Sequence, residues 1–237
     1  MHRKSKKNRL SIQILLSLQK IFKCKMKNFN STFYNIPINN SVLSELLADV
    51  KFPKDKISRL EKNGNLIRIK NGLYVISEKN NENEISKELI ANHIYGISYI
   101  SLETALAYYG MIPERVYRIR SMTTKRAKTF STPLGNFEYK TVPADYFGIG
   151  LRQEIIQNQY AFLIATPTKA VCDMIVVTPN LRLQSVQAMQ NYLNEDLRID
   201  FDVIKNLDRE IVEQCIEIGK KKMELNLLNK LFISPLM

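Results

Sequence analysis

The sequence predicts an α+β protein with a small N-terminal domain of helices and a hairpin, and a larger, mixed α+β C-terminal domain with a helical tail. Two observations lead to this prediction. The apolar residues change along the chain between helical spacing and alternation, and Pro, Gly or Asn residues punctuate the changes. A polar segment, residues 78–84, is typical of a linker. We therefore expect an N-terminal extension over residues 1–30 and domains over residues 31–80 and 85–237.

The chain is basic, and its charge is unevenly distributed. It has 237 residues and a formal net charge of +12, which favours polyanions such as nucleic acid as partners. Residues 1–44 contain nine Lys or Arg and no Asp or Glu, so the remaining residues carry a net charge of only +3. A basic patch that binds a polyanion therefore has to be identified locally. The hydrophobic share of 45% is sufficient for a packed core.

The cysteines and histidines indicate neither a disulfide framework nor a metal site. Cys24, Cys172 and Cys215 are far apart and odd in number, which is typical of free thiols in a reducing compartment. With only His2 and His93 present, we expect no zinc site and no Ser-His-Asp triad. The sequence also has no Walker, nucleophile-elbow or Rossmann glycine pattern. We therefore expect a protein that is not an enzyme and that needs no cofactor.

A basic, partly apolar segment opens the chain. Its apolar residues follow helical spacing, but residues 10–18 are interrupted by polar residues and are shorter than the roughly 20 apolar residues of a membrane span. No small-residue cleavage site follows. We expect an extension of a cytoplasmic protein with no membrane partner. The alternative is an arm that contacts DNA or a membrane.

The next part of the chain predicts two helices separated by a proline. The first helix would cover residues 41–50. Three leucines share one of its faces: Leu43, Leu46 and Leu47. Pro53 is suited to the first turn of a second helix over residues 54–62, because its missing N–H has no intrahelical partner there. The residues of this helix that would face the core are Ile57 and Leu60. Asn63-Gly64 would end the helix in a left-handed turn.

A β-hairpin is expected directly after these helices. Residues 66–70 and 73–76 have the alternation of strands, and Asn71-Gly72 between them favours a type I′ turn, in which both residues have positive φ. The inward-facing residues of the first strand would be Ile67 and Ile69.

Helix, turn, helix and hairpin within about 40 residues form the sequence pattern of a winged helix-turn-helix. A helix fits the major groove of DNA, and a β-hairpin wing can contact the adjacent backbone or minor groove. Lysines would neutralise phosphates, whereas Arg59 could read guanine and Ser58 could donate a hydrogen bond. The predicted DNA-binding residues are Lys54, Lys56, Ser58, Arg59, Lys62, Arg68, Lys70 and Asn71. The alternative is that these residues form the solvated face of a structural helix and hairpin.

The C-terminal domain alternates helices and strands. Thr166 and Pro167 have the residue types of an N-cap and a first helical position. The expected elements are a helix over residues 98–109, strands over 116–123, 137–142 and 160–165, a turn at 133–136, a helix over 166–177, and a helical tail from 183 to about 232.

Four segments, in this order, resemble the AbiEi-type antitoxins. KISRLEKNGNLIRIKNGLYVIS is similar to the N-terminal domain of that family. The segments YISLETALAYYGMIPE, TVPADYFGIG and ATPTKAVCDMI are similar to its C-terminal domain, so the resemblance covers roughly residues 41–180. It implies a type IV toxin–antitoxin system of phage defence. In such a system the winged helix represses its own promoter in double-stranded DNA, and the C-terminal domain neutralises a nucleotidyltransferase-like toxin.

An E-x-K element on an expected strand supports a different hypothesis. Glu138 and Lys140 have the spacing of restriction-type nucleases, in which the carboxylate holds Mg²⁺ and the lysine assists the nucleophile. Such a site needs a second carboxylate at the end of a strand. The candidates are Glu103 and Glu114, and neither is expected at that position. The alternative function is therefore an active or degenerate nuclease that the winged helix targets to DNA.

Asp200 and Asp202 have the spacing of a metal pair but lack a preceding Gly-Ser element, so we expect one of them to cap a helix.

Five cations of the C-terminal domain are candidates for a second basic patch: Arg118, Arg120, Lys125, Arg126 and Lys128. Arg118 and Arg120 would share a strand face, because their spacing is two. The patch could extend the DNA footprint or meet an acidic surface of the toxin. A solvated strand and loop would have the same residues, so this alternative stays open.

Overall fold

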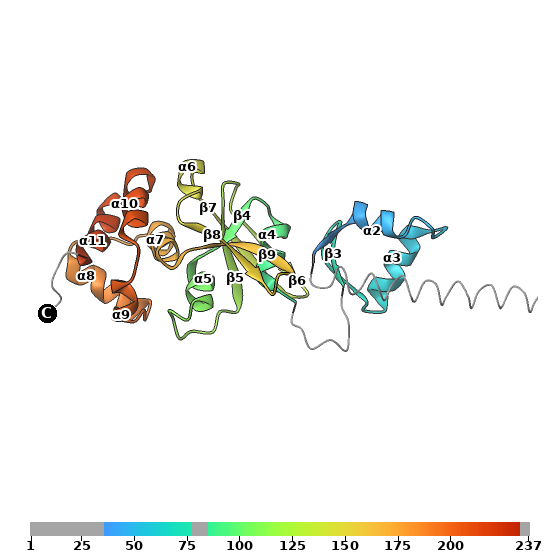
Figure 1. Ribbon diagram of the computed structural model, residues 1–237, viewed down its shortest axis with the longest axis horizontal. Helices are drawn as coiled ribbons and strands as arrows, with labels where there is room; N and C mark the ends of the chain where they lie inside the picture. The colour runs from blue at the N-terminus through green and yellow to red at the C-terminus, as the bar shows by residue number, and fades with distance from the viewer. Residues whose placement is uncertain (1–35, 77–84, 233–237) are drawn as a thin grey trace, which may run out of the picture. The chain divides into compact units, whose positions relative to one another are not determined.

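The computed structural model in Figure 1 describes residues 36–76 and 85–232 of the chain. It contains both helices and sheets, which confirms the α+β class. The chain divides into two compact units, Met1–Ile85 and Ser86–Met237. Three features of the sequence lie outside the described residues: the extension over residues 1–30, the linker over residues 78–84, and Cys24.

The described part of the first unit combines two helices with a three-stranded antiparallel sheet. Its elements are β1 (Ile38–Asn39), α2 (Asn40–Leu46), α3 (Pro53–Lys62), β2 (Leu66–Lys70) and β3 (Leu73–Ile76). Strand β3 lies between β1 and β2. One cluster of buried residues joins the helices and the sheet: Ile38, Leu43, Leu47, Ile57, Leu60, Leu66, Tyr74 and Ile76. Because α3 and the hairpin both contribute to this core, their relative position is fixed within the unit.

Local sequence signals set the ends of the two helices. The Asn39 Oδ1 atom accepts a backbone N–H at 2.9 Å and caps α2. Pro53 begins α3, as the sequence predicts, and Gly64 follows the helix with φ at +70°. One expectation is wrong, because Leu46 is 41% exposed. Helix α2 ends at this residue, earlier than the expected end at residue 50, whereas Leu43 and Leu47 are buried as expected.

The hairpin departs from the expected type I′ turn. That turn needs positive φ at both central residues, but only Gly72 has it, at +75°, and the preceding asparagine does not. The register of the two strands shifts between Arg68 and Lys70, as in a β-bulge. A bulge interrupts the alternation of side chains. As a result Ile69 is buried as expected, whereas Ile67 is only half-buried.

The second unit is built on a six-stranded mixed sheet. In spatial order its strands are β6 (Lys128–Thr132), β7 (Gly135–Thr141), β5 (Arg118–Thr123), β4 (Ser98–Ile100), β9 (Tyr160–Ala165) and β8 (Leu151–Ile156). The pairs β5–β7 and β4–β9 are parallel, and the other neighbours are antiparallel. Strands β6 and β8 therefore form the two edges.

Helices cover both faces of this sheet. Helix α4 (Lys87–Ile94) packs on β4 and β9, and α5 (Leu102–Tyr108) packs on β5 and on α7 (Pro167–Val177). The Tyr139 hydroxyl of β7 donates to a carbonyl of α4 at 2.6 Å, while Arg120 of β5 pairs with a carboxylate of α5. Arg120 lies opposite the residue before Tyr139 in the register. Successive side chains of a strand point to opposite faces, so α4 and α5 lie on opposite sides of the sheet.

The C-terminal helices gather beside α7 at one end of the second unit (Figure 1). After the short helix α6 (Ala144–Phe147), the later elements are α8 (Val186–Asn191), the π-helical turn η1 (Tyr192–Asp196), α9 (Phe201–Lys205), α10 (Arg209–Ile218) and α11 (Lys222–Leu231). The expected tail is thus divided into several helices. Asp208 caps α10, and Lys221 has φ at +59° before α11. No helix in the described ranges is long and apolar enough to cross a membrane.

Strand β9 and helix α7 have the expected bounds. Strands β5 and β7 differ from theirs by one or two residues, and β7 begins within the expected turn at residues 133–136. Three other strands depart further from the expectations. Residues 98–100 form β4 rather than the beginning of a helix. All three are buried, because a central strand that is covered on both faces loses the polar alternation. Strands β6 and β8 were not expected. Both lie at an edge of the sheet and contain mostly polar or half-buried residues.

Candidate nucleic-acid interface

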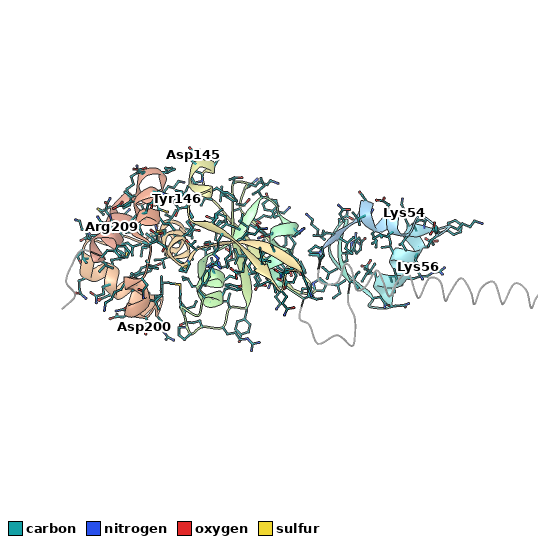
Figure 2. The ribbon with its side chains drawn as sticks, viewed as in Figure 1. Lys54, Lys56, Asp145, Tyr146, Asp200 and Arg209 are labelled. Carbon is teal, nitrogen blue, oxygen red and sulfur yellow. The ribbon has the colours of Figure 1, made fainter. Side chains whose placement is uncertain are left out.

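The predicted contact residues of α3 lie away from its buried face. Ile57 and Leu60, at 6% and 8% exposure, determine which side of the helix faces the core. Lys56 is half-buried, and the other candidates on this helix are exposed: Lys54, Ser58, Arg59 and Lys62. Figure 2 marks Lys54 and Lys56 on this helix. The helix is therefore amphipathic, with its cations available to a ligand outside the unit.

The hairpin adds polar side chains close to its turn. Arg68, Lys70 and Asn71 are exposed. The Arg68 Nη2 atom donates a hydrogen bond to Asn71 Oδ1 at 2.9 Å. This bond restrains the guanidinium group, which keeps further N–H donors for another acceptor.

The first unit has a surplus of positive charge on this helix and hairpin. Residues 36–76 contain seven Lys or Arg and four Asp or Glu. Within the described part of the chain, Lys54, Arg59 and Lys62 form no ion pair, because no carboxylate oxygen lies within 4.0 Å of their side-chain nitrogen atoms. These cations can therefore bind phosphates without first breaking an internal ion pair.

In the second unit, two of the five candidate cations are paired with carboxylates. Arg118 and Arg120 lie on the face of β5 that meets Glu138 of β7. Glu138 forms ion pairs with Arg118 at 3.2 Å, with Arg120 at 3.4 Å and with Lys140 at 2.8 Å. Arg120 also pairs with Glu103 of α5 at 2.5 Å. Both guanidinium groups thus have carboxylate partners inside the unit.

These contacts also define the chemistry of the E-x-K element. Partial burial by itself raises the pKa of Glu138, but hydrogen bonds from Lys140 and Arg118 and the charge of Arg120 outweigh it and lower the pKa to about 2. A pocket of about 600 Å³ opens beside this cluster. The Arg120 guanidinium joins Glu138 to Glu103, the second carboxylate that the nuclease hypothesis requires. Among the described residues, no group of three or more His, Cys, Asp or Glu is arranged to hold a metal ion.

The other three candidate cations lie at the opposite end of β5. Lys125 and Arg126 are in the loop that follows β5, and Lys128 begins β6. All three are exposed. Lys128 lies opposite Tyr139 in the register, so its side chain is on the other face of the sheet from Glu138. The structure therefore distributes the five cations between two separate surfaces.

Sequence reasoning missed a buried polar network that joins α7 to neighbouring elements. Lys169 and Asp173 of α7 are both 0% exposed and lie 3.3 Å apart. The Asp173 Oδ2 atom accepts hydrogen bonds from Tyr99 at 3.0 Å and Ser101 at 2.6 Å. Lys169 donates to the backbone carbonyl of Tyr146, which is marked in Figure 2, at 3.0 Å. Burial raises the pKa of the Asp173 carboxyl, whereas Lys169 and the hydroxyl donors act against this shift.

A sequence signal for this network was present. Lys169 and Asp173 are four residues apart in a helix whose other residues are mostly apolar, so they had to share a side of a buried helix. A charged pair in such a position has to be satisfied internally.

The cysteines and the Asp200–Asp202 pair are the remaining candidate residues from the sequence. Cys172 and Cys215 are buried free thiols. The Asp200 carbonyl accepts the backbone N–H groups of Val203 and Ile204, which places Asp200 at the start of α9. The side chain of Asp202 is outside the described set.

Comparison of the chain with protein-family models finds no match, and comparison with curated proteins finds no significant match.

Proposed function

We propose that this protein is a DNA-binding transcriptional autorepressor and the antitoxin of a phage-defence operon. The observation that carries the proposal is the surplus of exposed cations on α3 and on the β2–β3 hairpin. In a winged helix-turn-helix the second helix enters the major groove, and the wing contacts the adjacent backbone. The first unit has this order of elements, and one core holds helix and hairpin together.

The side chains have roles that follow from their chemistry. Lys54 and Lys62 are point charges that neutralise phosphates, which provides affinity without sequence information. Arg59 has a planar, five-donor fork that can bind the O6 and N7 atoms of guanine together. Arg68, held by Asn71, would contact the backbone beside the groove. Repression of a specific promoter requires both kinds of contact.

The antitoxin part of the proposal is supported by the resemblance of the second unit to AbiEi-type antitoxins. Two of the resembling segments cover α5 and most of β4 and α7, and they contribute Tyr99, Ser101, Lys169 and Asp173 to the buried network. The resemblance thus involves residues that maintain the fold of this unit. The proposed partner is a nucleotidyltransferase-like toxin, encoded next to this chain.

The ion pairs of Glu138 favour this proposal over the nuclease alternative. Glu138 already forms ion pairs with Arg118, Arg120 and Lys140, so Mg²⁺ would have to displace these contacts and would be repelled by their positive charge. We therefore assign these residues to stabilisation of the sheet.

The test of DNA binding is a gel-shift titration of the full chain on the promoter region of its own gene. The double variant Arg59→Ala, Arg68→Ala should lose at least about tenfold in affinity, because each removed contact with a base or phosphate costs roughly 1–3 kcal/mol. The matched control is Arg182→Ala, Lys220→Ala, which removes the same charge from exposed positions of the second unit. Equal affinity of the two double variants would show that α3 and the hairpin do not form the DNA interface.

A further inference from the structure

Strand β8 is an edge of the six-stranded sheet that lacks the usual protection of an edge. In the described part of the chain its only neighbouring strand is β9, and the register between them is uninterrupted, so no bulge bends it away. It contains no Pro or Lys, and its one Arg is balanced by one Glu. The opposite edge differs, because exposed cations accompany the beginning of β6: Lys125, Arg126 and Lys128. Strand β8 can therefore accept a further strand.

The contacts of β9 determine which backbone groups of β8 point to the free edge. Directly beyond the two strands, the Thr166 N–H donates to the Gly150 carbonyl at 2.8 Å. Bonded and non-bonded residue pairs alternate in an antiparallel ladder, so Arg152 bonds β9 and Gln153 does not. Leu163 lies opposite Gln153, and its N–H donates to a side chain of α4 at 2.6 Å instead. The backbone groups directed away from the sheet are therefore those of Leu151, Gln153 and Ile155.

The side chains of β8 divide between the two faces of the sheet. Arg152 and Glu154 lie on one face and form an ion pair with each other at 2.7 Å. The Arg152 side chain is 51% exposed, and its guanidinium group has five N–H donors, so it can bind a second carboxylate. On the other face Ile155 is 60% exposed, which leaves a large aliphatic side chain at the edge. A further strand would thus contact complementary groups on both faces.

We infer that β8 is a dimerisation edge, which pairs antiparallel with the β8 strand of a second copy of the chain about a two-fold axis at Gln153. The inference goes beyond the proposed function and does not depend on it, because the partner is the chain itself. Strand addition to a free edge is a recurring mode of association, and a two-fold interface joins the same surface of both copies. In this register the outward groups of Gln153 bond those of the partner's Gln153, and those of Leu151 bond the partner's Ile155.

The charges of β8 select this axis over its two neighbours. An axis at Arg152 or at Glu154 would also pair the outward backbone groups, but it would place like charges directly opposite each other, which is unfavourable. With the axis at Gln153, Arg152 lies opposite the partner's Glu154, and Glu154 lies opposite the partner's Arg152. These are non-bonded pairs of the ladder, in which side chains are closest. The strand is therefore complementary to itself in charge as well as in its backbone groups.

The first experiment measures the mass of the full chain by sedimentation equilibrium over a range of protein concentrations. The wild type should approach twice the mass of the chain as the concentration rises. Gln153→Pro should weaken dimerisation by at least about tenfold, because it removes one interface N–H from each copy. It removes no bond to β9, since this N–H points outward. Gln153→Thr is the matched control, because it keeps the N–H. Circular dichroism and thermal unfolding check that the variants are folded.

The second experiment tests the register by reversing charges. Arg152→Glu or Glu154→Arg alone places like charges opposite each other in both cross-strand pairs and should weaken dimerisation by about three- to tenfold. The double variant Arg152→Glu, Glu154→Arg makes both pairs complementary again and should dimerise like the wild type. A mixture of the two single variants should form a heterodimer for the same reason. Arg209→Glu, on an exposed position of α10, is the control for a change of net charge.

Each contrary result overturns the inference at a defined point. A chain that stays monomeric at every concentration would show that β8 does not pair with a second copy, and would leave the edge to a different partner. A dimer that Gln153→Pro does not weaken, or that Gln153→Thr weakens equally, would place the interface elsewhere or in side chains alone. Failure of the double charge variant to restore the dimer would contradict the axis at Gln153.

Discussion

Lys169 and Asp173 are charged residues in the centre of the second unit, and their contacts explain why they are tolerated there. An isolated buried charge is expensive, but Lys169 and Asp173 pair with each other, and three further groups form hydrogen bonds with them: Tyr99, Ser101 and the Tyr146 carbonyl. The network connects β4, α6 and α7. Its members therefore depend on one another, and loss of one leaves an unpaired group in the interior.

Asp173→Ala should destabilise the second unit by about 3–5 kcal/mol, because it leaves the Lys169 ammonium buried without its carboxylate. The double variant Lys169→Met, Asp173→Leu should cost less than Asp173→Ala alone, since no uncompensated charge remains. Urea denaturation at neutral pH gives both values. The matched control is the exposed pair Arg209 and Glu213, which has the same i,i+4 spacing and whose removal should cost under about 0.5 kcal/mol. A cost for Asp173→Ala no larger than that control would contradict a stabilising role.

At this scale the sequence predicts what a single element determines and misses what several elements create together. The burial of Ile57 and Leu60 follows from helical spacing within α3. The pairing of Arg120 with Glu103 and Glu138 could not be predicted, because the three residues come from α5, β5 and β7. For the same reason, sequence alone could not separate the paired arginines of β5 from the exposed cations that follow this strand: Lys125, Arg126 and Lys128.

At the scale of elements, a helix or strand is predicted accurately from the sequence when the residues that determine its ends are adjacent in the chain. Helices α3 and α7 begin at Pro53 and Pro167, and α7 has a Thr166 cap, so their bounds are encoded in adjacent residues. Strand β4 could not be recognised, because its complete burial depends on helices from other parts of the chain. The hairpin turn was misjudged because a bulge supplied the geometry that a type I′ turn would otherwise provide.

Gly150, which precedes β8, illustrates how closely the elements of the second unit approach each other. Its φ is +57°, and a Cβ atom there would meet the side chains of Ile211 and Lys169 at 2.9 Å. Gly150→Ala should therefore cost about 2–4 kcal/mol, from the left-handed backbone and the overpacking together. Gly148→Ala is the matched control, because its φ is −77° and no atom lies within 4 Å of the added Cβ. Thermal or urea unfolding that gave the same stability for both variants would contradict the proposed close packing at Gly150.

At the scale of the whole molecule, the chain has two compact units with different surfaces. The first presents cations of α3 and a hairpin, and the second contains a six-stranded sheet with helices on both faces and a buried polar network. The first unit has a cluster of buried residues, and the second unit contains buried residues of its own. The first is small and should be only marginally stable alone, whereas the second is large enough to fold by itself. This division underlies the proposal that repression and toxin neutralisation belong to different units.

The most direct test of that division is expression of residues 85–237 without the first unit, in cells that carry both the toxin and a reporter under the chain's own promoter. We expect the fragment to restore growth as well as the full chain does and to leave the promoter unrepressed. Growth depends on a protein surface of the second unit, whereas promoter recognition depends on α3 and the hairpin. Failure of a soluble, folded fragment to restore growth, or full repression by it, would contradict the assignment of the two functions to the two units.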